Sequence, residues 1–315
     1  MSEFTQPRIG VSACVLGDKV RYDGGHKRSA FVAAQLADFF TFKPICPEVG
    51  MGLPVPRPTI HLRETDAGLR LTDSRSGDRD HTAAMEAFFT HQTKLLSSLD
   101  GYILAAKSPS CGMERIKVYD QSGSLVHRQG QGLFASLLRR RFPHLPLEED
   151  GRLNDAGLRE SFITRVYAYH GFRHQVLIKP SVAALVTYHS RNKLLVMAYS
   201  PQTYQSLGRL VAKAKGRLES TLEEYQSLLF SALGKPTDRR KQTNALMHLQ
   251  GYFKRKLSRQ DKQELSEQIE KYRLGHVPLL APMTLLRHHL KHYPNSYLQQ
   301  QSYLQPYPEA LGLRA

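Results

Sequence analysis

Three cysteines are the residues of this chain best suited to chemistry. Cys14 follows the apolar run RIGVSA, Cys46 follows FKPI, and Cys111 follows ILAAKSPS. They form no CxxC pair and their number is odd, which argues against a disulfide framework and indicates a reducing, cytoplasmic setting. Each cysteine lies at or just beyond the carboxyl end of a predicted strand. Because these ends share one edge of a parallel sheet, where ligands bind, we expect the three thiols to converge.

Three interpretations of these cysteines are open. Free cysteines often serve as small buried apolar residues, but CPEVG and SPSCG are loop-forming sequences. A single thiolate such as Cys111 could be a nucleophile, which leaves the other two without a role. Three thiolates could instead hold a metal. Structural zinc normally takes a fourth protein ligand, whereas an iron–sulfur cubane on three cysteines keeps one iron open as a Lewis acid. Spacing alone does not choose between zinc and a cluster.

The elements that would position the cysteines alternate between strands and helices. Strands are predicted at RIGVSAC, TFKPIC and GYILAA, and helices at KRSAFVAAQLADFF, HTAAMEAFFTHQTKLLSSL and GLFASLLRRRF. This alternation predicts a mostly parallel sheet covered on both faces. The segment TIHLRETDAGLRLTD alternates strictly around a Gly turn, which is typical of a β-hairpin.

The second half of the chain has helical spacing instead. Residues 243–257 place four apolar side chains on one face, namely Leu246, Leu249, Phe253 and Leu257. SRQDKQELSEQIEKYRLG begins with the cap Ser258 and ends at Gly275, and PQTYQSLGRLVAKA and TLEEYQSLLFSAL are also helical in pattern. The sequence therefore predicts an α/β N-terminal domain over residues 1–170 and an all-α C-terminal domain over residues 171–315.

Positive charge is concentrated in the second domain. The chain has 44 Lys and Arg against 28 Asp and Glu, and residues 171–315 hold 22 and 9 of these, a net +13 of the total +16. Such an asymmetry predicts an anionic partner for this domain. A chain of 315 residues with 41% apolar residues can bury a substantial core. The sequence predicts a cytoplasmic protein without a membrane span, and it does not predict an oligomeric state.

Several motifs together resemble a known family. They are GVSACVLGDKVRYDGGHK, ICPEVGMGLPVPRPTIHL, GDRDHT, KSPSCG and GQGLFASLL, and over about the first 165 residues they resemble the thiouracil desulfidase (TudS-like) family. The segments YHSRNKLLVMAYS, LMHLQGYFKRKL and QSYLQPYPEALGLR resemble the YbgA-like helical domain. In combination, the two domains resemble the bacterial desulfidases (RudS-like) that act on 4-thiouridine in tRNA.

The resemblance implies a cofactor and roles for the first domain. A [4Fe-4S] cluster is expected on Cys14, Cys46 and Cys111, with the fourth iron taking sulfur from a thiocarbonyl, and the essential glutamate of the family matches Glu48. Soft cluster iron suits a soft sulfur atom. Water deprotonated by Glu48 would then attack the ring carbon, and sulfide would leave without net electron transfer. Proton donors are expected at Ser108, which the resemblance favours, or Ser110, and pocket residues at Tyr22, Asp23, Arg57 and Lys107.

The basic helical domain would then bind tRNA. Its candidate phosphate contacts are Arg239, Arg240, Lys241, Lys254, Arg255 and Lys256, and Tyr252 is a candidate for stacking on a base. The predicted activity is conversion of 4-thiouridine in tRNA to uridine and sulfide. Two rivals remain open: a desulfidase of free thiouracil or related thiolated bases, and a non-catalytic RNA-binding protein whose cysteines hold a structural metal.

Overall fold

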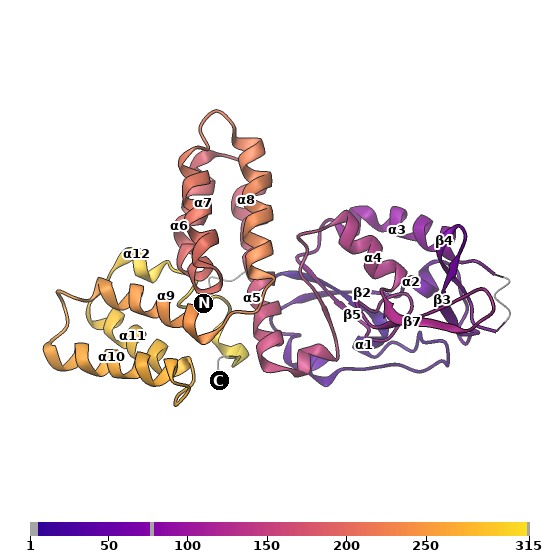
Figure 1. The fold of residues 1–315 in the computed structure, drawn as a ribbon, viewed down its shortest axis with the longest axis horizontal. Helices are drawn as coiled ribbons and strands as arrows, with labels where there is room; N and C mark the ends of the chain where they lie inside the picture. Colours follow the sequence, from indigo (N-terminus) through magenta and orange to yellow (C-terminus); the bar gives the residue numbers. More distant parts are fainter. Residues whose placement is uncertain (1–5, 76–78, 314–315) are drawn as a thin grey trace. The chain divides into compact units, whose positions relative to one another are not determined.

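The structure is a computed structural model that describes residues 6–75 and 79–313, so Gly77 and Asp78 of the GDRDHT motif and Arg314 of the last motif lie outside the described residues. The chain divides into two compact units, one within residues 5–155 and one within residues 156–315 (Figure 1). The domain boundary predicted after residue 170 falls inside helix α5, Ala156–Phe172, which belongs to the second unit.

The first unit is built on a parallel sheet, here called sheet A. Its strands are β1 (Arg8–Ser12), β2 (Thr41–Ile45), β5 (Gly101–Leu104) and β8 (Leu147–Glu149), in the order β2-β1-β5-β8. Every strand pair in it is parallel. The central strands β1 and β5 are almost continuously apolar and buried, as expected for strands of a parallel sheet covered on both faces.

Aromatic side chains join sheet A to two of its helices, α3 (Thr82–Leu96) and α4 (Leu133–Arg141). The ring of Phe134 on α4 lies 5.7 Å from that of Tyr102 on β5 and 5.8 Å from that of Phe89 on α3, both with edge-on geometry. The predicted α/β class of the N-terminal domain is confirmed. Both helices lie where their periodicity predicts them.

A second sheet, here called sheet B, was only half predicted. The expected hairpin is present as β3 (Ile60–Thr65) and β4 (Gly68–Asp73), with Gly68 at φ 94° beside the turn. Strand β6 (Ile116–Tyr119) pairs parallel with β3, and β7 (Leu125–Gly130) pairs antiparallel with β6. The order is β4-β3-β6-β7.

The predicted helix over KRSAFVAAQLADFF is wrong. Only a wide π-helical turn, Phe31–Gln35, forms there. Backbone bonds from Lys27 N to Cys14 O and from Ser29 N to Val15 O keep the first part of the segment beside the start of the chain. Because of these bonds, the segment up to Ser29 does not form a helix. The other short elements of this unit are α1 (Ala13–Leu16), α2 (Pro47–Gly50) and a 3₁₀ turn at Arg152–Asn154.

The second unit is helical, which confirms the predicted class. After α5 and a π-helical turn, Arg173–Leu177, come α6 (Val182–Tyr199), α7 (Pro201–Ala212), α8 (Leu218–Leu233), α9 (Arg239–Tyr252), α10 (Arg259–Arg273), α11 (Leu280–His292), α12 (Ser296–Gln299) and a 3₁₀ turn at Glu309–Leu311. Phe172, Tyr188 and Tyr225 are fully buried at its centre. Among the described residues, no helix combines the length and apolar character needed to cross a bilayer.

The predicted helix over residues 243–257 is displaced along the chain. It is α9, which begins at Arg239 because the Asp238 side chain caps it by accepting a bond from Lys241 N at 2.9 Å. It ends at Tyr252, just after Gly251, and the following residues turn towards the cap of α10. The predicted apolar face is nevertheless buried, at Leu246, Leu249, Phe253 and Leu257.

Candidate active site

The three cysteines line one cavity at the carboxyl edge of sheet A, here called the cysteine cavity. Cys14 lies in α1 directly after β1, Cys46 stands between β2 and α2, and Cys111 lies in the loop after β5. The cavity has a volume of about 350 Å³, and all three residues are among those that line it. The strand ends therefore bring together cysteines that are far apart in sequence.

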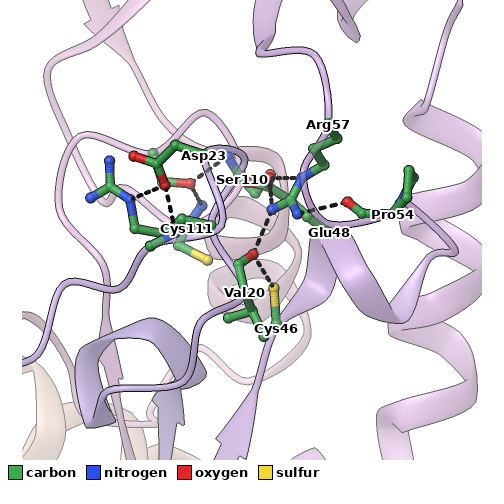
Figure 2. Close-up of polar contacts among 11 residues, drawn as sticks. Val20, Asp23, Cys46, Glu48, Pro54, Arg57, Ser110 and Cys111 are labelled. Atoms are coloured by element: carbon green, nitrogen blue, oxygen red, sulfur yellow. Dashed lines mark hydrogen bonds and ion pairs between the residues drawn. The ribbon is translucent and has the colours of Figure 1, made fainter.

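Cys111 is buried and Cys14 and Cys46 are half-buried, and the three cysteines lie within electrostatic range of one another. Burial, together with the neighbouring Cys46, raises the pKa of Cys14 to about 11. Burial likewise raises the pKa of Cys46, mostly by desolvation, and that of Cys111, where Cys14 and Cys46 also contribute. None of the three cysteines is in a disulfide. Figure 2 shows Cys46 and Cys111 with the polar groups around them.

This donor set fits an iron–sulfur cluster. Three thiolates in one shielded cavity would repel one another without a cation, and soft sulfur ligands suit iron–sulfur clusters. The hydroxyl of Tyr102 lies within electrostatic range of the three cysteines. It is fully buried, its pKa is raised first by burial and then by the three cysteines, and it has no hydrogen-bond partner among the described residues. Tyr102 does not line the cysteine cavity, so the fit to a cluster rests on the three cysteines.

Glu48 is held in the cavity wall by two partners. Its Oε2 accepts bonds from Arg57 Nε at 3.1 Å and Arg57 Nη2 at 2.7 Å, and its Oε1 accepts one from Ser110 Oγ at 2.9 Å (Figure 2). Both members of the ion pair are shielded, with side chains 14% and 3% exposed. Glu48 is therefore fixed two residues from Cys46.

Arg57 is almost fully occupied by protein acceptors. Besides Glu48, its guanidinium donates to Val20 O at 2.9 Å and to Pro54 O at 3.1 Å. Arg57 lines the cavity, where the sequence places a substrate contact. Its hydrogen bonds assign it mainly to positioning Glu48, because little of its donor capacity is left for a ligand.

The two serines of KSPSCG have different surroundings. Ser108 lines the cavity, and its Oγ accepts bonds from Ser110 N at 3.2 Å and Cys111 N at 3.1 Å. Its own hydroxyl proton remains available to a ligand. Ser110 is fully buried and donates to Glu48. The loop therefore shapes the Cys111 position through Ser108 and holds the carboxylate through Ser110.

The remaining predicted pocket residues are not all brought together. Tyr22 and Lys107 line the cavity, and Lys107 has a left-handed backbone with φ 64°. Asp23 is not among the lining residues. Its carboxylate accepts a bond from Gly25 N at 3.0 Å and pairs with Arg21 at 3.5 Å, as in a turn.

Sequence reasoning missed three residues that shape this site. Tyr102 lies in an apolar strand, whose sequence gives no sign of a functional role. Lys27 lines the cavity, and its Nζ donates to Asp150 Oδ1 at 3.1 Å and to Ala106 O at 3.3 Å. The same Asp150 oxygen accepts a bond from Ala106 N at 2.8 Å. The only sequence signal was the position of Lys27 at the end of GVSACVLGDKVRYDGGHK.

In the helical unit, the predicted phosphate contacts occupy two places. Arg239, Arg240 and Lys241 form the first turn of α9, where Arg239 and Arg240 are exposed and Lys241 pairs with Asp238 at 3.0 Å. Lys254, Arg255 and Lys256 are exposed in the turns after α9. They therefore follow the helix, whereas the predicted helix over residues 243–257 would have included them.

Tyr252 lies at the end of α9 with 45% of its surface exposed. Its ring stacks on that of Tyr297 at 5.5 Å and 28°, and Lys193 Nζ lies 4.9 Å from the centre of the Tyr297 ring. Both aromatic residues thus belong to a surface that also carries a cation. Phe253, by contrast, is buried in the core.

Comparisons with known proteins match both units. Residues 9–150 match the family model described as 2-thiouracil desulfurase, and residues 193–308 match the model described as protein of unknown function DUF1722. A curated relative, the uncharacterized protein YbgA of Escherichia coli strain K12, is 34% identical over 157 residues, covering 49% of this chain and 93% of YbgA. A solved structure of the [4Fe-4S]-dependent thiouracil desulfidase TudS is 31% identical in sequence. It covers 50% of this chain and 99% of its own, with a TM-score of 0.39.

Proposed function

We propose a function for this chain from its two families: it belongs to the 2-thiouracil desulfurase family through its first unit and to the YbgA-like DUF1722 family through its second. It is a desulfidase of thiolated bases, and the proposed reaction converts 4-thiouridine in tRNA to uridine and sulfide. A [4Fe-4S] cluster on Cys14, Cys46 and Cys111 would serve this reaction. The observation that carries the proposal is the convergence of three cysteines and a doubly held carboxylate on one cavity.

The cluster, which Cys14, Cys46 and Cys111 would hold, would supply Lewis-acid iron with an affinity for the soft sulfur of a thiocarbonyl. Glu48 then acts on water. Its carboxylate takes a proton while the water oxygen forms a bond to the ring carbon. Arg57 and Ser110 hold both carboxylate oxygens, so the base needs little reorganisation to reach the water.

The departing sulfur needs a proton as the C–S bond breaks. Ser108 faces the cavity, and its oxygen already accepts two backbone bonds, so its hydroxyl proton is directed away from the loop. We assign the proton donation to Ser108 and the positioning of Glu48 to Ser110. The balance is one thiocarbonyl and one water giving one carbonyl and one hydrogen sulfide, without oxidant or reductant.

The tRNA preference rests on the charge of the second unit. Cations at a helix start oppose the helix dipole at a cost of about 0.3–1 kcal/mol each, so Arg239, Arg240 and Lys241 in the first turn of α9 are unfavourable for the helix alone. A phosphate beside them would reverse that penalty. RNA also offers splayed bases, which suit an exposed aromatic such as Tyr252.

The test begins with anaerobic reconstitution with iron and sulfide. A brown protein is then incubated with bulk tRNA, and nucleoside digests are analysed for 4-thiouridine. Loss of this nucleoside with matching sulfide release supports the proposal. Sulfide release from free thiouracil but not from tRNA would favour the free-base rival. A colourless protein with one bound zinc and no sulfide release would leave only the RNA-binding rival.

A further inference from the structure

A groove runs along the seam between two neighbouring helices of the second unit, α10 and α11. The two helices pack against each other, and the short connection over residues 274–279 makes them an antiparallel hairpin (Figure 1). The groove has a volume of about 760 Å³. We call it the α10–α11 groove, and its polar lining includes Asp261, Glu264, Gln268, His288 and His289.

Helical spacing places metal-ligating residues on both walls of this groove. On α11, Leu285, His288 and His292 recur at intervals of three and four residues, so they lie on one stripe of the helix. Leu285 and His288 line the groove, and His292 therefore continues the same wall. On α10, Asp261 and Glu264 are three residues apart and also share one side of their helix.

The two histidines of this stripe are suited to chelation. The centres of the His288 and His292 rings lie 4.5 Å apart, and both residues are exposed. Within the described parts of the chain, neither ring forms a hydrogen bond or an ion pair. Two histidines at positions i and i+4 on one helix face can bind one metal ion, as in the H-E-x-x-H zinc motif. Because both side chains are exposed, they can rotate to present one nitrogen each to the same ion.

Helix α10 supplies a carboxylate on the opposite wall. Asp261 is used locally, since its Oδ2 accepts a bond from Ser258 Oγ at 2.8 Å at the start of α10. Glu264 is exposed and has no hydrogen bond or ion pair among the residues that the structure describes. The groove lining contains neither Lys nor Arg, although residues 171–315 carry a net charge of +13. A cation in the groove would therefore meet acidic and neutral groups.

A buried histidine marks the same end of the groove. His289 lines it with only 5% of its surface exposed, and its Nε2 has no hydrogen-bond partner among the described residues. Burial lowers the pKa of His289; Asp261 and Glu264 oppose this shift, and His288 and His292 add to it. All four residues thus lie within electrostatic range of one imidazole. A buried polar nitrogen without a partner is uncommon and points to a ligand nearby.

We propose that the α10–α11 groove binds one divalent transition-metal ion of the Zn²⁺ class, through His288 and His292 of α11 and Glu264 of α10. Imidazole and carboxylate are usual ligands of such ions, and water would fill a fourth, tetrahedral position. The ion would link α10 to α11 and stabilise the hairpin that they form. No residue of the first unit takes part, so the site is independent of the proposed desulfidase function.

Zinc binding to the full-length protein is measured by calorimetry. The wild type is compared with His288→Ala/His292→Ala, which leaves Glu264 as the single proposed ligand. We expect this variant to bind one zinc ion fewer per chain, because its affinity for that ion should fall by about 100-fold or more. Zinc bound elsewhere, including at the three cysteines, is common to both proteins and cancels in the difference. Glu264→Gln should weaken the same binding step by about tenfold.

The matched control is His248→Ala/His276→Ala, which removes two exposed histidines outside the groove. It should bind as many zinc ions as the wild type, and far-UV circular dichroism tests whether each variant is folded. Equal zinc stoichiometry and affinity in the wild type and His288→Ala/His292→Ala would overturn the inference, as would an equal loss in the control. Binding of Mg²⁺ as tight as that of Zn²⁺ would show a carboxylate site without histidine ligands, which also overturns it.

A stability measurement tests the link between the helices. An ion that binds only the folded state raises the free energy of unfolding, so zinc should raise the urea midpoint of the wild type and of the control. In His288→Ala/His292→Ala this rise should be smaller, and in Glu264→Gln it should need about tenfold more zinc. No rise in the wild type would overturn the inference. A rise of the same size in the wild type and both groove variants would assign the stabilisation to another site, which also overturns it.

Discussion

Neutralising Glu48 without changing its shape separates proton abstraction from cluster binding. In Glu48→Gln the amide can still meet Arg57 and Ser110, but it cannot accept a proton from water. We expect turnover to fall by about 10²–10⁴-fold, as for loss of a general base, while iron content and colour remain. The measurement is sulfide release per bound cluster. Glu64→Gln, at an exposed position on β3, is the control, and a wild-type rate in Glu48→Gln would exclude this role.

We expect each of the three cysteines to be required for both the cluster and activity. Replacing Cys14, Cys46 or Cys111 with Ala leaves two thiolates, which are too few to hold a cubane with one open iron. Each variant should therefore lose both the cluster and activity. Iron and acid-labile sulfide analysis after anaerobic reconstitution checks this. A Cys14→Ala protein with full cluster content and full activity would rule out the three-ligand site.

The motifs predicted which residues meet at the cavity better than the contacts that support them. The convergence of the cysteines followed from their positions after strands, and Glu48 from its motif. The role of Arg57 did not follow, because its carbonyl acceptors at Val20 and Pro54 depend on a folded loop. Tyr102 also looked like an ordinary strand residue. Only the fold shows that its hydroxyl is buried and has no hydrogen-bond partner among the described residues.

Helix α4 supports the Cys111 loop through its amino end. Gly132 N donates to Gly112 O at 2.8 Å, Leu133 N to Pro109 O at 3.0 Å and Ala135 N to Ser110 O at 3.2 Å. A Cβ on Gly132 would lie 2.5 Å from Ser110 O and 2.9 Å from Cys111 N. We expect Gly132→Ala to displace this loop and lower cluster content.

The control for that variant is Gly151→Ala, whose new Cβ would find its nearest atom at 3.9 Å. Far-UV circular dichroism tests whether both variants are folded, and iron analysis reports the cluster. Equal iron content in Gly132→Ala and the wild type would show that the loop tolerates the shift. Loss of iron in Gly151→Ala would show that the assay reports general damage.

Helix α6 contains an acid-sensitive contact with α8. His189 Nδ1 lies 3.2 Å from Tyr225 Oη, and burial, aided by Lys193, lowers the pKa of His189 to about 4. The unfolded chain, with a His pKa near 6.5, binds this proton more readily than the folded chain. The free energy of unfolding should therefore fall by up to about 1.4 kcal/mol per pH unit as the pH drops from about 6.5 to 4.

Urea unfolding at several pH values measures this dependence, and His189→Gln should make it shallower. The wild type and the variant are compared under the same conditions, so that titration of carboxylates elsewhere cancels. An identical dependence of the urea midpoint on pH in both proteins would contradict the assigned role of His189.

Among the elements, segments with regular apolar periodicity were mostly predicted at their observed positions, whereas strands β6 and β7 and the turn at Phe31–Gln35 were not. The hairpin of β3 and β4 and the helices α3, α4 and α10 have the expected positions. Strand β7, LVHRQG, was missed because it is mostly exposed and has no apolar alternation, and strand β6, IKVY, because it has only two buried residues. The segment around Phe31–Gln35 has helical spacing, but backbone bonds to α1 determine its course.

For the whole molecule, the charge of the second unit predicts a strong dependence on salt. Each phosphate contact releases a counterion, so tRNA activity at low substrate concentration should fall with a log–log slope of about 0.7–0.9 per contact. Arg239→Ala/Arg240→Ala/Lys241→Ala should flatten this slope. The rate on 4-thiouridine nucleoside should depend little on salt. An unchanged slope in the triple variant would remove the start of α9 from tRNA binding.

Strand β8 lies at the edge of sheet A, and Asp150 directly after it holds both Lys27 and the backbone of Ala106. During translation, the wall of the cysteine cavity thus stays incomplete until residue 150 has left the ribosome. Part of the helical unit is then still to be made, at a rate of about 5–20 residues per second. In that interval the three cysteines of the first unit can come together before all the basic residues of the second unit have been made.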